Sequence, residues 1–525
     1  MKRRQWMTVK DLLRVNAFKW PDKIGAKDLY KALTFKQWNE RACKLANALS
    51  ALGLKPGDRF AVLAYNCMEW MEIYAAAAKG GFICVPIMFR LSPPEIQYIL
   101  THSDARILIV QDQLISKVNE IRNSLSTVEN YVSFGLESKV FTEYSCYEEL
   151  MQGASTEEPE IRVTGDDVWV IMYTGGTTGR PKGVIKTHES LYAYYLIMVH
   201  EHIFNFDDTV LLVMPLCHIN SLFYSFVSTY VGGTVMAYNM VSFEPEKLLN
   251  TLAEHRITFT SLVPTHYIMI LALAEEVKRK YDVSCVSKLV CSSAPARRDT
   301  KLKIMEYFKN SKLYEAYGST EAGTVTVLKP EDALRKLGSI GREPIGTDMV
   351  KLIDDEGNEI HEPDVVGELY SRSPMLFEGY WKDPVQTEKA FRGEYFSAGD
   401  MGFRDEDGYY YLVDRKANMI ISGGENVFPS EVENVVGGNP KVKDVAVIGV
   451  PHEKWGEQVT AIVVLHEGAD ATEQEISDYC RGKIAAYKVP KKVIFIRDEE
   501  MPRSGAGKIL HRVLREKYGM WKDHI

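Results

Sequence analysis

The sequence predicts an α/β protein, because segments with helical periodicity alternate with short apolar runs through its first half. Helical segments and the apolar runs that follow them are residues 36–52 and 60–63, 73–78 and 82–87, and 94–100 and 106–110. Alternation of this kind is typical of parallel strands joined by helices that cover the sheet. Two further observations mark other regions. Glycine and proline punctuate short strands from about residue 335, and a small unit with its own strands follows Asp414.

The same alternation returns further along the chain and then gives way to a different pattern. Expected there are strand 209–214, helix 245–255, strand 257–263, helix 264–280, strand 288–292 and helix 295–309. The glycine-punctuated strands beyond them predict an antiparallel, barrel-like region. The last unit is expected to contain strands 442–450 and 458–465, helix 472–486 and strand 493–496. A boundary near residues 415–418 separates this small unit from the rest.

Composition argues against several classes of protein. Hydrophobic residues make up 46% and charged residues 26% of the 525 residues, which fits a soluble globular protein of several domains. The net charge of -8 gives no sign of a nucleic-acid surface. No apolar run reaches the roughly 18 residues that a membrane span needs. The eight cysteines are scattered without a CxxC pair, which argues against zinc and against a disulfide framework and favours a reducing cytoplasm.

Residues 173–183 form the most informative segment, and they follow the apolar run 168–172. Glycines that let the backbone come close, and threonines that add hydroxyl donors, can wrap a phosphate, while Lys182 adds a point charge. The segment is not a Walker A motif, because proline precedes the lysine and glycine follows it. A P-loop NTPase is therefore disfavoured. The alternative to a phosphate site is a flexible surface loop.

Six further segments follow this loop in a fixed order: residues 214–218, 317–321, 397–400, 414–415, 423–433 and 502–508. Together with the loop they resemble the motifs of the adenylate-forming superfamily. Its members are acyl- and aryl-CoA synthetases, adenylation domains of peptide synthetases and firefly-type luciferases. The resemblance runs from about residue 25 to residue 515. The small-domain segments look most like those of acyl- or aryl-CoA ligases.

The resemblance implies a two-domain α/β fold. Residues 1–415 are expected to form a large N-terminal domain of two helix-covered sheets plus a distorted β-barrel, which binds AMP and the acyl group. Residues 416–525 are expected to form a small mobile α+β domain that carries Lys508. The family's hinge position falls on Ala417.

The resemblance also implies a reaction in two steps. A carboxylate attacks the α-phosphate of ATP to give an acyl-adenylate and pyrophosphate, and the thiol of coenzyme A then displaces AMP. The implied catalytic residues are Lys508, Glu321, Thr320 and His218, and Glu321 is the implied ligand of Mg2+, a hard cation that a carboxylate suits. Lys508 would bridge the substrate carboxylate and the α-phosphate oxygens.

Further residues are implied to contact the nucleotide and coenzyme A. The β- and γ-phosphates would lie against Thr174, Gly175, Gly176, Thr177, Thr178, Gly179 and Lys182. The adenine and the ribose would lie against Ser293, Ala294, Pro295, Tyr317, Gly318, Asp400 and Arg415. Coenzyme A would pass near Ser422, Gly423, Gly424 and Glu425.

Three positions depart from the family's usual pattern. Gly175 stands where the phosphate loop usually has serine, Ala398 where a threonine precedes Gly399-Asp400, and Ala417 where the hinge commonly has aspartate or lysine. None of the three removes a charged catalytic group, so they bear on rate and domain rotation more than on activity itself.

The implied acyl pocket is mixed aromatic and small, without lysine or arginine. Its residues are Cys217, His218, Asn220, Phe223, Tyr267, Ser292, Ser319 and Ala322. A second substrate carboxylate would lack a partner there, which favours a monocarboxylate that is medium-chain aliphatic or carries one ring. Two alternatives stay open: a non-catalytic nucleotide- and acyl-binding homologue, and an adenylating enzyme with another acceptor. The expected partners are small molecules, and a homodimer is compatible with the sequence.

Overall fold

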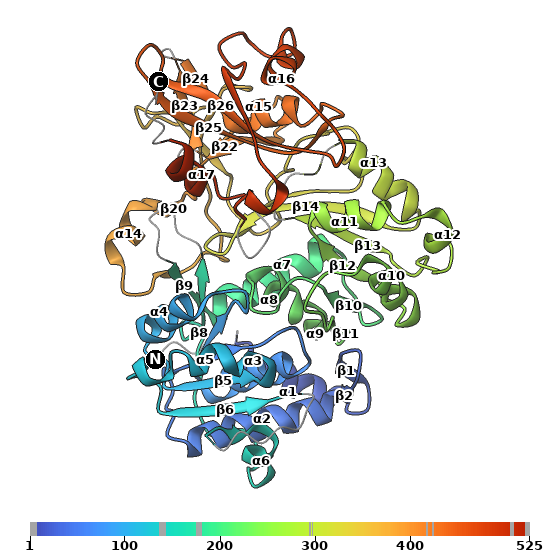
Figure 1. Cartoon of the computed structure of the whole chain (residues 1–525). Coiled ribbons are helices and arrows are strands. Elements are labelled where there is room, and N and C mark those ends of the chain that lie inside the picture. The colour runs from blue at the N-terminus through green and yellow to red at the C-terminus, as the bar shows by residue number, and fades with distance from the viewer. Residues whose placement is uncertain are drawn as a thin grey trace. The chain divides into compact units, whose positions relative to one another are not determined.

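The computed structural model describes residues 8–135, 143–174, 181–292, 296, 298–415, 418–422, 425–503 and 509–519 (Figure 1). The chain divides into two compact units. The first contains residues 1–349 and 371–396, and the second contains residues 350–370 and 397–525. The predicted domain border after residue 415 lies beside residues 416 and 417, which are outside the described parts of the chain, so that border stays a prediction.

The first unit contains two eight-stranded sheets. One has the order β18-β9-β8-β4-β3-β5-β6-β7. Its strands are β3 (Arg59–Leu63), β4 (Ile83–Ile87), β5 (Ile107–Gln111), β6 (Asn130–Phe134), β7 (Ser145–Cys146), β8 (Val168–Thr174), β9 (Lys182–Thr187) and β18 (Gly379–Tyr380). Its pairs are parallel from β7 to β8 and antiparallel where β9 lies between β8 and β18.

The other sheet has the order β15-β14-β13-β12-β10-β11-β1-β2. Its strands are β1 (Ile24–Lys27), β2 (Ala32–Thr34), β10 (Thr209–Leu212), β11 (Thr234–Ala237), β12 (Phe259–Leu262), β13 (Lys288–Ser292), β14 (Lys312–Ser319) and β15 (Gly323–Leu328). The inner pairs are parallel, and the pairs at the two edges, β1–β2 and β14–β15, are antiparallel. A short hairpin of β19 (Phe391–Arg392) and β20 (Tyr395–Phe396) completes the strands of this unit.

Helices connect and cover these strands. They are α1 (Lys10–Lys19), α2 (Phe35–Ala51), α3 (Glu69–Gly80), α4 (Pro93–Ser103), α5 (Ile115–Asn119), α6 (Tyr147–Gln152), α7 (His188–Glu201), α8 (Ile219–Ser225), α9 (Val227–Tyr230), α10 (Pro245–Glu254), α11 (Pro264–Leu271), α12 (Glu275–Lys278), α13 (Arg298–Tyr307) and α14 (Pro384–Lys389). Local sequence explains where they begin: Thr34 and Gln37 form a capping box at the start of α2. The helix α3 ends at Gly81, whose φ of 64° suits glycine.

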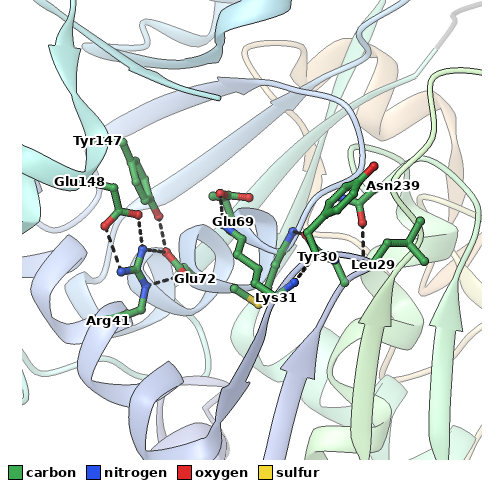
Figure 2. Close-up of polar contacts among 11 residues, drawn as sticks. Leu29, Tyr30, Lys31, Arg41, Glu69, Glu72, Tyr147, Glu148 and Asn239 are labelled. Carbon is green, nitrogen blue, oxygen red and sulfur yellow. Dashed lines mark hydrogen bonds and ion pairs between the residues drawn. The ribbon is translucent and has the colours of Figure 1, made fainter. Parts of the chain in front are cut away.

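A buried ion pair joins α2 and α3 (Figure 2). The Arg41 Nε lies 2.7 Å from the Glu72 carboxylate, which is fully buried and also accepts a hydrogen bond of 2.9 Å from the Tyr147 hydroxyl. Burial raises the pKa of Glu72, and the guanidinium opposes that rise. Glu148 lies 2.6 Å from the same guanidinium. The network fixes three helices together, and the cavity of about 570 Å³ next to it contains none of the predicted site residues.

The second unit combines two sheets. The four-stranded antiparallel sheet has the order β16-β17-β21-β22, made from β16 (Lys351–Ile353), β17 (Gly367–Tyr370), β21 (Asp400–Arg404) and β22 (Tyr410–Arg415). It forms in the region where the sequence predicts a distorted barrel, and no pairing between β16 and β22 closes it within the residues described. The five-stranded sheet contains β23 (Ile420–Ser422), β24 (Glu425–Val427), β25 (Val442–His452), β26 (Gly456–Leu465) and β27 (Lys492–Phe495).

Alternation along β25 packs helices against both faces of the five-stranded sheet. Val447 points to the core that includes residues of α15 (Pro429–Val436) and α16 (Glu473–Cys480), while Ile448 packs with Leu514 of α17 (His511–Tyr518). The α+β prediction for this part of the chain is therefore confirmed.

Two predicted helices are wrong in length. The helix expected over 264–280 is broken into α11 and α12, because Ala274 has an extended backbone with ψ of 145°. The helix expected over 472–486 ends at Cys480, because Arg481 is extended with ψ of 134° and Gly482 has φ of +75°. In both places the residues beyond the helix end still have a composition typical of helices. The hydrophobic periodicity therefore does not reveal where the backbone leaves the helix.

Candidate active site

The phosphate-loop segment joins two adjacent antiparallel strands. Thr174 at the end of β8 and Lys182 at the start of β9 are Cα partners, so the two ends of the loop lie side by side. Gly183 follows in the pair with Tyr173. A Cβ atom on Gly183 would come within 2.9 Å of the Ile171 side chain, so the close packing at the base of the loop requires glycine.

The β14–β15 hairpin presents Glu321 on a tight turn. Ser319 and Gly323 are Cα partners, and the Ser319 hydroxyl accepts a hydrogen bond of 3.0 Å from the Ala322 N–H. A Cβ atom on Gly318 would lie 2.0 Å from the Gly323 carbonyl oxygen, so this turn also depends on glycine. Thr320 is buried beside Glu321. The sequence motif 317–321 is therefore a strand end with its turn.

Tyr380 connects the predicted phosphate and metal residues, and no sequence motif pointed to it. Its hydroxyl donates a hydrogen bond of 3.0 Å to the Glu321 Oε1, and the Lys182 Nζ lies 4.8 Å from the centroid of its ring. The Phe377 N–H donates 2.8 Å to the Glu321 carbonyl oxygen. Lys182 also donates to the Gln386 side chain at 3.3 Å. The structure thus brings Lys182 and Glu321 to one tyrosine side chain, Lys182 at its ring and Glu321 at its hydroxyl.

Lys186 is a second residue that sequence reasoning missed. It lies four positions after Lys182 on β9, so the two side chains project from the same face of the strand. Its Nζ is buried and donates to the Met375 carbonyl oxygen. Burial lowers the pKa of Lys186 to about 7, and the carboxylates of Glu321 and Glu378 oppose that shift. The sequence signal that could have pointed to Lys186 is its place directly after the apolar pair Val184-Ile185.

The implied acyl-pocket residues are partly grouped at the N-terminus of α8. His218 is the N-cap, and its Nδ1 accepts a hydrogen bond of 3.2 Å from the Asn220 N–H. The Asn220 amide donates to Ser261 at 3.2 Å and to Ser292 at 3.0 Å. Burial raises the pKa of Cys217 to about 12, so this thiol stays protonated at neutral pH. Asn220 and Ser292, two of the implied pocket residues, are thus in direct contact, and the acyl pocket itself stays a prediction.

The predicted adenine residues begin where β13 and β14 run side by side. Ser292 and Ala316 are Cα partners in this parallel pair, so Tyr317 follows on β14 directly beyond the last residue of β13. Residues 293–295 themselves lie outside the described parts of the chain. The register places Tyr317 beside the point where that segment starts.

The second unit contains the predicted ribose residues. Asp400 of β21 and Arg415 of β22 are Cα partners, so the two positions are neighbours across the sheet. The Ser397 hydroxyl accepts 2.9 Å from the Gly399 N–H and donates 2.8 Å to the Glu368 carboxylate, which shapes the turn before Asp400.

The segments that would meet coenzyme A and carry the catalytic lysine also lie in this unit. Ser422 and Glu425 are Cα partners at the end of the β23–β24 hairpin, with Ser422 buried and Glu425 exposed. A bridge between Arg503 and Ile509 brackets the segment that contains the predicted lysine. Several predicted residues lie outside the described residues: Lys508, Gly175, Gly176, Thr177, Thr178, Gly179, Ser293, Ala294, Pro295, Gly423, Gly424 and Ala417.

The donor set suits a cation that is carried in with a nucleotide. The described residues hold no group of three or more His, Cys, Asp or Glu side chains that could enclose a metal on their own. Mg2+ usually keeps several waters and takes one or two carboxylates together with substrate phosphates. A single carboxylate such as Glu321, oriented by Tyr380 beside the base of the phosphate loop, fits that requirement.

Comparison with known families gives the same assignment as these motifs. Residues 13–381 match the model of the AMP-binding enzyme family, and residues 431–508 match that of the AMP-binding enzyme C-terminal domain. The chain belongs to this family. The prediction of the adenylate-forming superfamily, and of an α/β fold with a large N-terminal AMP-binding domain and a small C-terminal one, is therefore confirmed.

Similar proteins cover nearly the whole chain. A long-chain-fatty-acid–CoA ligase of Mycobacterium tuberculosis is 37% identical over 492 residues, which is 93% of this chain and 93% of that protein. A feruloyl-CoA synthase of an Amycolatopsis species is 35% identical and covers 93% of this chain and 94% of its own length. The predicted class, an AMP-forming acyl-CoA synthetase, is confirmed by these full-length relatives.

Solved structures agree with this chain at the level of the fold. The anthranilate CoA ligase AuaEII in complex with anthranoyl-AMP aligns with a TM-score of 0.88 at 27% identity, over 97% of both chains. ATP-bound MatB from Rhodopseudomonas palustris aligns with a TM-score of 0.86 at 29% identity, over 97% of this chain and 99% of that one. In the described parts of the present chain, no helix is long and apolar enough to cross a membrane.

Proposed function

We propose that this chain activates a monocarboxylic acid as an acyl-adenylate at the expense of ATP and then transfers the acyl group to coenzyme A. Pyrophosphate leaves in the first step and AMP in the second. The observation that carries the proposal is the meeting of Lys182 and Glu321 at Tyr380, beside the two ends of the phosphate loop. That arrangement puts an ammonium and a carboxylate next to a loop suited to a nucleotide's β- and γ-phosphates.

Each proposed residue has a role that its chemistry can perform. Lys182 and the loop hold the phosphates, Thr320 contacts the phosphate region and Glu321 holds Mg2+. When bound, the cation would neutralise charge on the phosphate oxygens. Lys508 stabilises the charge that builds on the attacking carboxylate and the α-phosphate.

The nucleoside, the acyl group and coenzyme A occupy further proposed positions. Asp400 accepts hydrogen bonds from the ribose hydroxyls with support from Arg415, and Tyr317 frames the adenine. His218 lies beside the acyl group, and coenzyme A passes near Ser422 and Glu425.

The proposed substrate is a monocarboxylate, either a medium-chain aliphatic acid or one with a single ring. The absence of charge among the hydrogen-bond partners of the Asn220 side chain supports a monocarboxylate. These partners are the hydroxyls of Ser261 and Ser292. An anionic second group on the substrate would be desolvated there without a cation among these partners. Relatives with different names, a fatty-acid ligase and a feruloyl-CoA synthase, are similarly distant, so identity does not favour one acid over another.

We place this activity in the cytoplasm. All eight cysteines are free thiols, and one of them, Cys146, is exposed, which suits a reducing compartment.

The test is a pyrophosphate-release assay with ATP, Mg2+ and a panel of mono- and dicarboxylic acids, followed by measurement of AMP and of free thiol on addition of coenzyme A. The expected result is release with a subset of monocarboxylates and stoichiometric consumption of coenzyme A. Release without thiol consumption would favour another acceptor. No release with any acid, while ATP still binds, would favour a non-catalytic homologue.

A further inference from the structure

Lys186 differs from the other buried lysines of the described chain. Each of the others forms an ion pair with a carboxylate, at 2.6–2.7 Å: Lys79 with Glu158, Lys278 with Glu275, Lys288 with Asp208 and Lys301 with Glu315. Lys186 is fully buried on β9 and, within the same described residues, has no carboxylate at ion-pair distance. Burying an ammonium without a close partner is unfavourable, so the position of Lys186 calls for a physical reason.

The reason lies in the segment to which Lys186 is bonded. Its Nζ donates to the Met375 carbonyl oxygen. The residues that follow Met375 run along β9. The Glu378 N–H donates a hydrogen bond of 3.1 Å to the Ile185 carbonyl oxygen, and the Trp381 N–H donates one of 2.7 Å to the Gly183 carbonyl oxygen. Lys186 therefore fixes the start of a segment whose backbone is hydrogen-bonded to β9, the strand that carries Lys182.

The same segment holds Glu321 at both its backbone and its side chain. Phe377 donates to the Glu321 carbonyl oxygen at 2.8 Å, and Tyr380 donates to its Oε1 at 3.0 Å. The hairpin that bears Glu321 also approaches Met375 closely, since a Cβ atom on Gly323 would lie 2.7 Å from the Met375 Cβ. Met375 is thus the point where Lys186 and the Glu321 turn meet.

Lys186 and Glu321 interact through charge as well as through packing. The carboxylates of Glu321 and Glu378 both act on the ammonium of Lys186, which is fully buried. The attraction is mutual, so the ammonium also stabilises these two carboxylates where they lie.

We propose that Lys186 is a positioning residue for Glu321: through Met375 and by its charge it holds the carboxylate in the place from which it binds the nucleotide's divalent cation. This rests on the proposed role of Glu321. Residues that orient a metal ligand typically change metal affinity or activity by about 10- to 100-fold when removed. Lys186 is therefore expected to set the Mg2+ requirement while making no contact with ATP.

The experiment measures Mg2+ dependence in the full-length protein without turnover. At fixed ATP and without acid, the rise in Tm is recorded as Mg2+ is titrated, since a ligand that binds only the folded state stabilises it. Lys186→Met, which keeps bulk without charge, and Lys186→Gln, which keeps an N–H donor without charge, are compared with the wild type. The expected result for both is an increase of about 10-fold or more in the Mg2+ concentration for half the Tm shift.

Lys79→Met is the matched control, because Lys79 is equally buried but lies on α3 and forms an ion pair with Glu158. It should lower the Tm while leaving the Mg2+ midpoint unchanged. Lys186→Arg, if folded, should recover part of the shift by restoring charge. An unchanged midpoint in both Lys186→Met and Lys186→Gln would overturn the inference.

Glu321→Gln separates this inference from the proposal beneath it. If Glu321→Gln raises the midpoint and the Lys186 variants do not, only the role of Lys186 is wrong. If Glu321→Gln leaves the midpoint unchanged, the metal role of Glu321 is wrong and the inference about Lys186 is overturned with it.

Discussion

Replacement of Tyr380 by phenylalanine tests the centre of the proposed site with the removal of one oxygen atom. The hydroxyl donates 3.0 Å to the Glu321 Oε1, while the ring keeps its place 4.8 Å from the Lys182 Nζ and edge-on to Phe377 at 5.0 Å. Tyr380→Phe therefore removes the orientation of Glu321 and leaves the aromatic packing. Since half-buried Tyr380 contributes one hydrogen bond to a charged group, the loss is about 1.5–3 kcal/mol.

That free energy converts to a rate. Because 1.4 kcal/mol corresponds to a factor of ten, adenylation should fall by about 10- to 150-fold if the hydrogen bond is needed in the transition state. The assay is ATP–pyrophosphate exchange with the best acid of the panel, alongside thioester formation from a supplied acyl-adenylate. The second rate should change little, because pyrophosphate and its cation have left by then.

A second tyrosine–carboxylate pair provides the control. The Tyr395 hydroxyl donates 3.0 Å to the Asp348 carboxylate on the surface of the same unit, so Tyr395→Phe removes a comparable bond away from the phosphate loop. It should leave both half-reactions unchanged. If Tyr380→Phe slowed both half-reactions equally, or neither, Tyr380 would have no special part in placing Glu321.

Three other predictions concern the remaining proposed residues. Lys508→Ala should lower acyl-adenylate formation by about 100-fold or more, a size typical of losing one preorganised charge contact, and spare thioester formation from supplied acyl-adenylate; equal losses in the two rates would contradict this role. Asp400→Asn should weaken binding of ATP and of AMP in calorimetry, and unchanged affinities would exclude contact with the ribose. Ala417→Pro should leave pyrophosphate exchange intact and reduce thioester formation, because proline fixes φ near −65°. A folded Ala417→Pro protein, checked by its Tm, that makes thioester at the normal rate would exclude Ala417 as the pivot.

Local patterns predicted what depends on local chemistry. The alternation of helices and apolar runs indicated parallel sheets, and β13 (Lys288–Ser292) lies where the pattern placed it. Glycine-dependent turns were visible as motifs, since Gly318 and Gly183 leave no room for a side chain. These features follow from residues close together in sequence, and a single chain displays them.

Residues that act through distant pairings were not predictable in this way. Tyr380 reaches Glu321 only because β18 adds to the edge of β9, and two residues of strand give no periodic signal. The sequence does not predict the burial of Lys186, because a lysine in a strand usually faces water, whereas here Lys186 is fully buried on β9. The breaks that end α11 and α16 depend on single backbone angles, which composition does not report.

The strand β18 lies far beyond β9 in the sequence, and this separation has a consequence during synthesis of the protein. Strand β9 is complete once residue 187 has been synthesised, but its outer partner, residues 379–380, emerges from the ribosome much later. Until then β9 is an unpaired sheet edge, and such edges favour pairing with other chains. Lys182 lies at the start of that edge, and Lys186, which is buried in the folded protein, lies within it. Both side chains are charged and discourage this pairing. The lysines proposed to serve the nucleotide site would in this way also protect the nascent chain from aggregation.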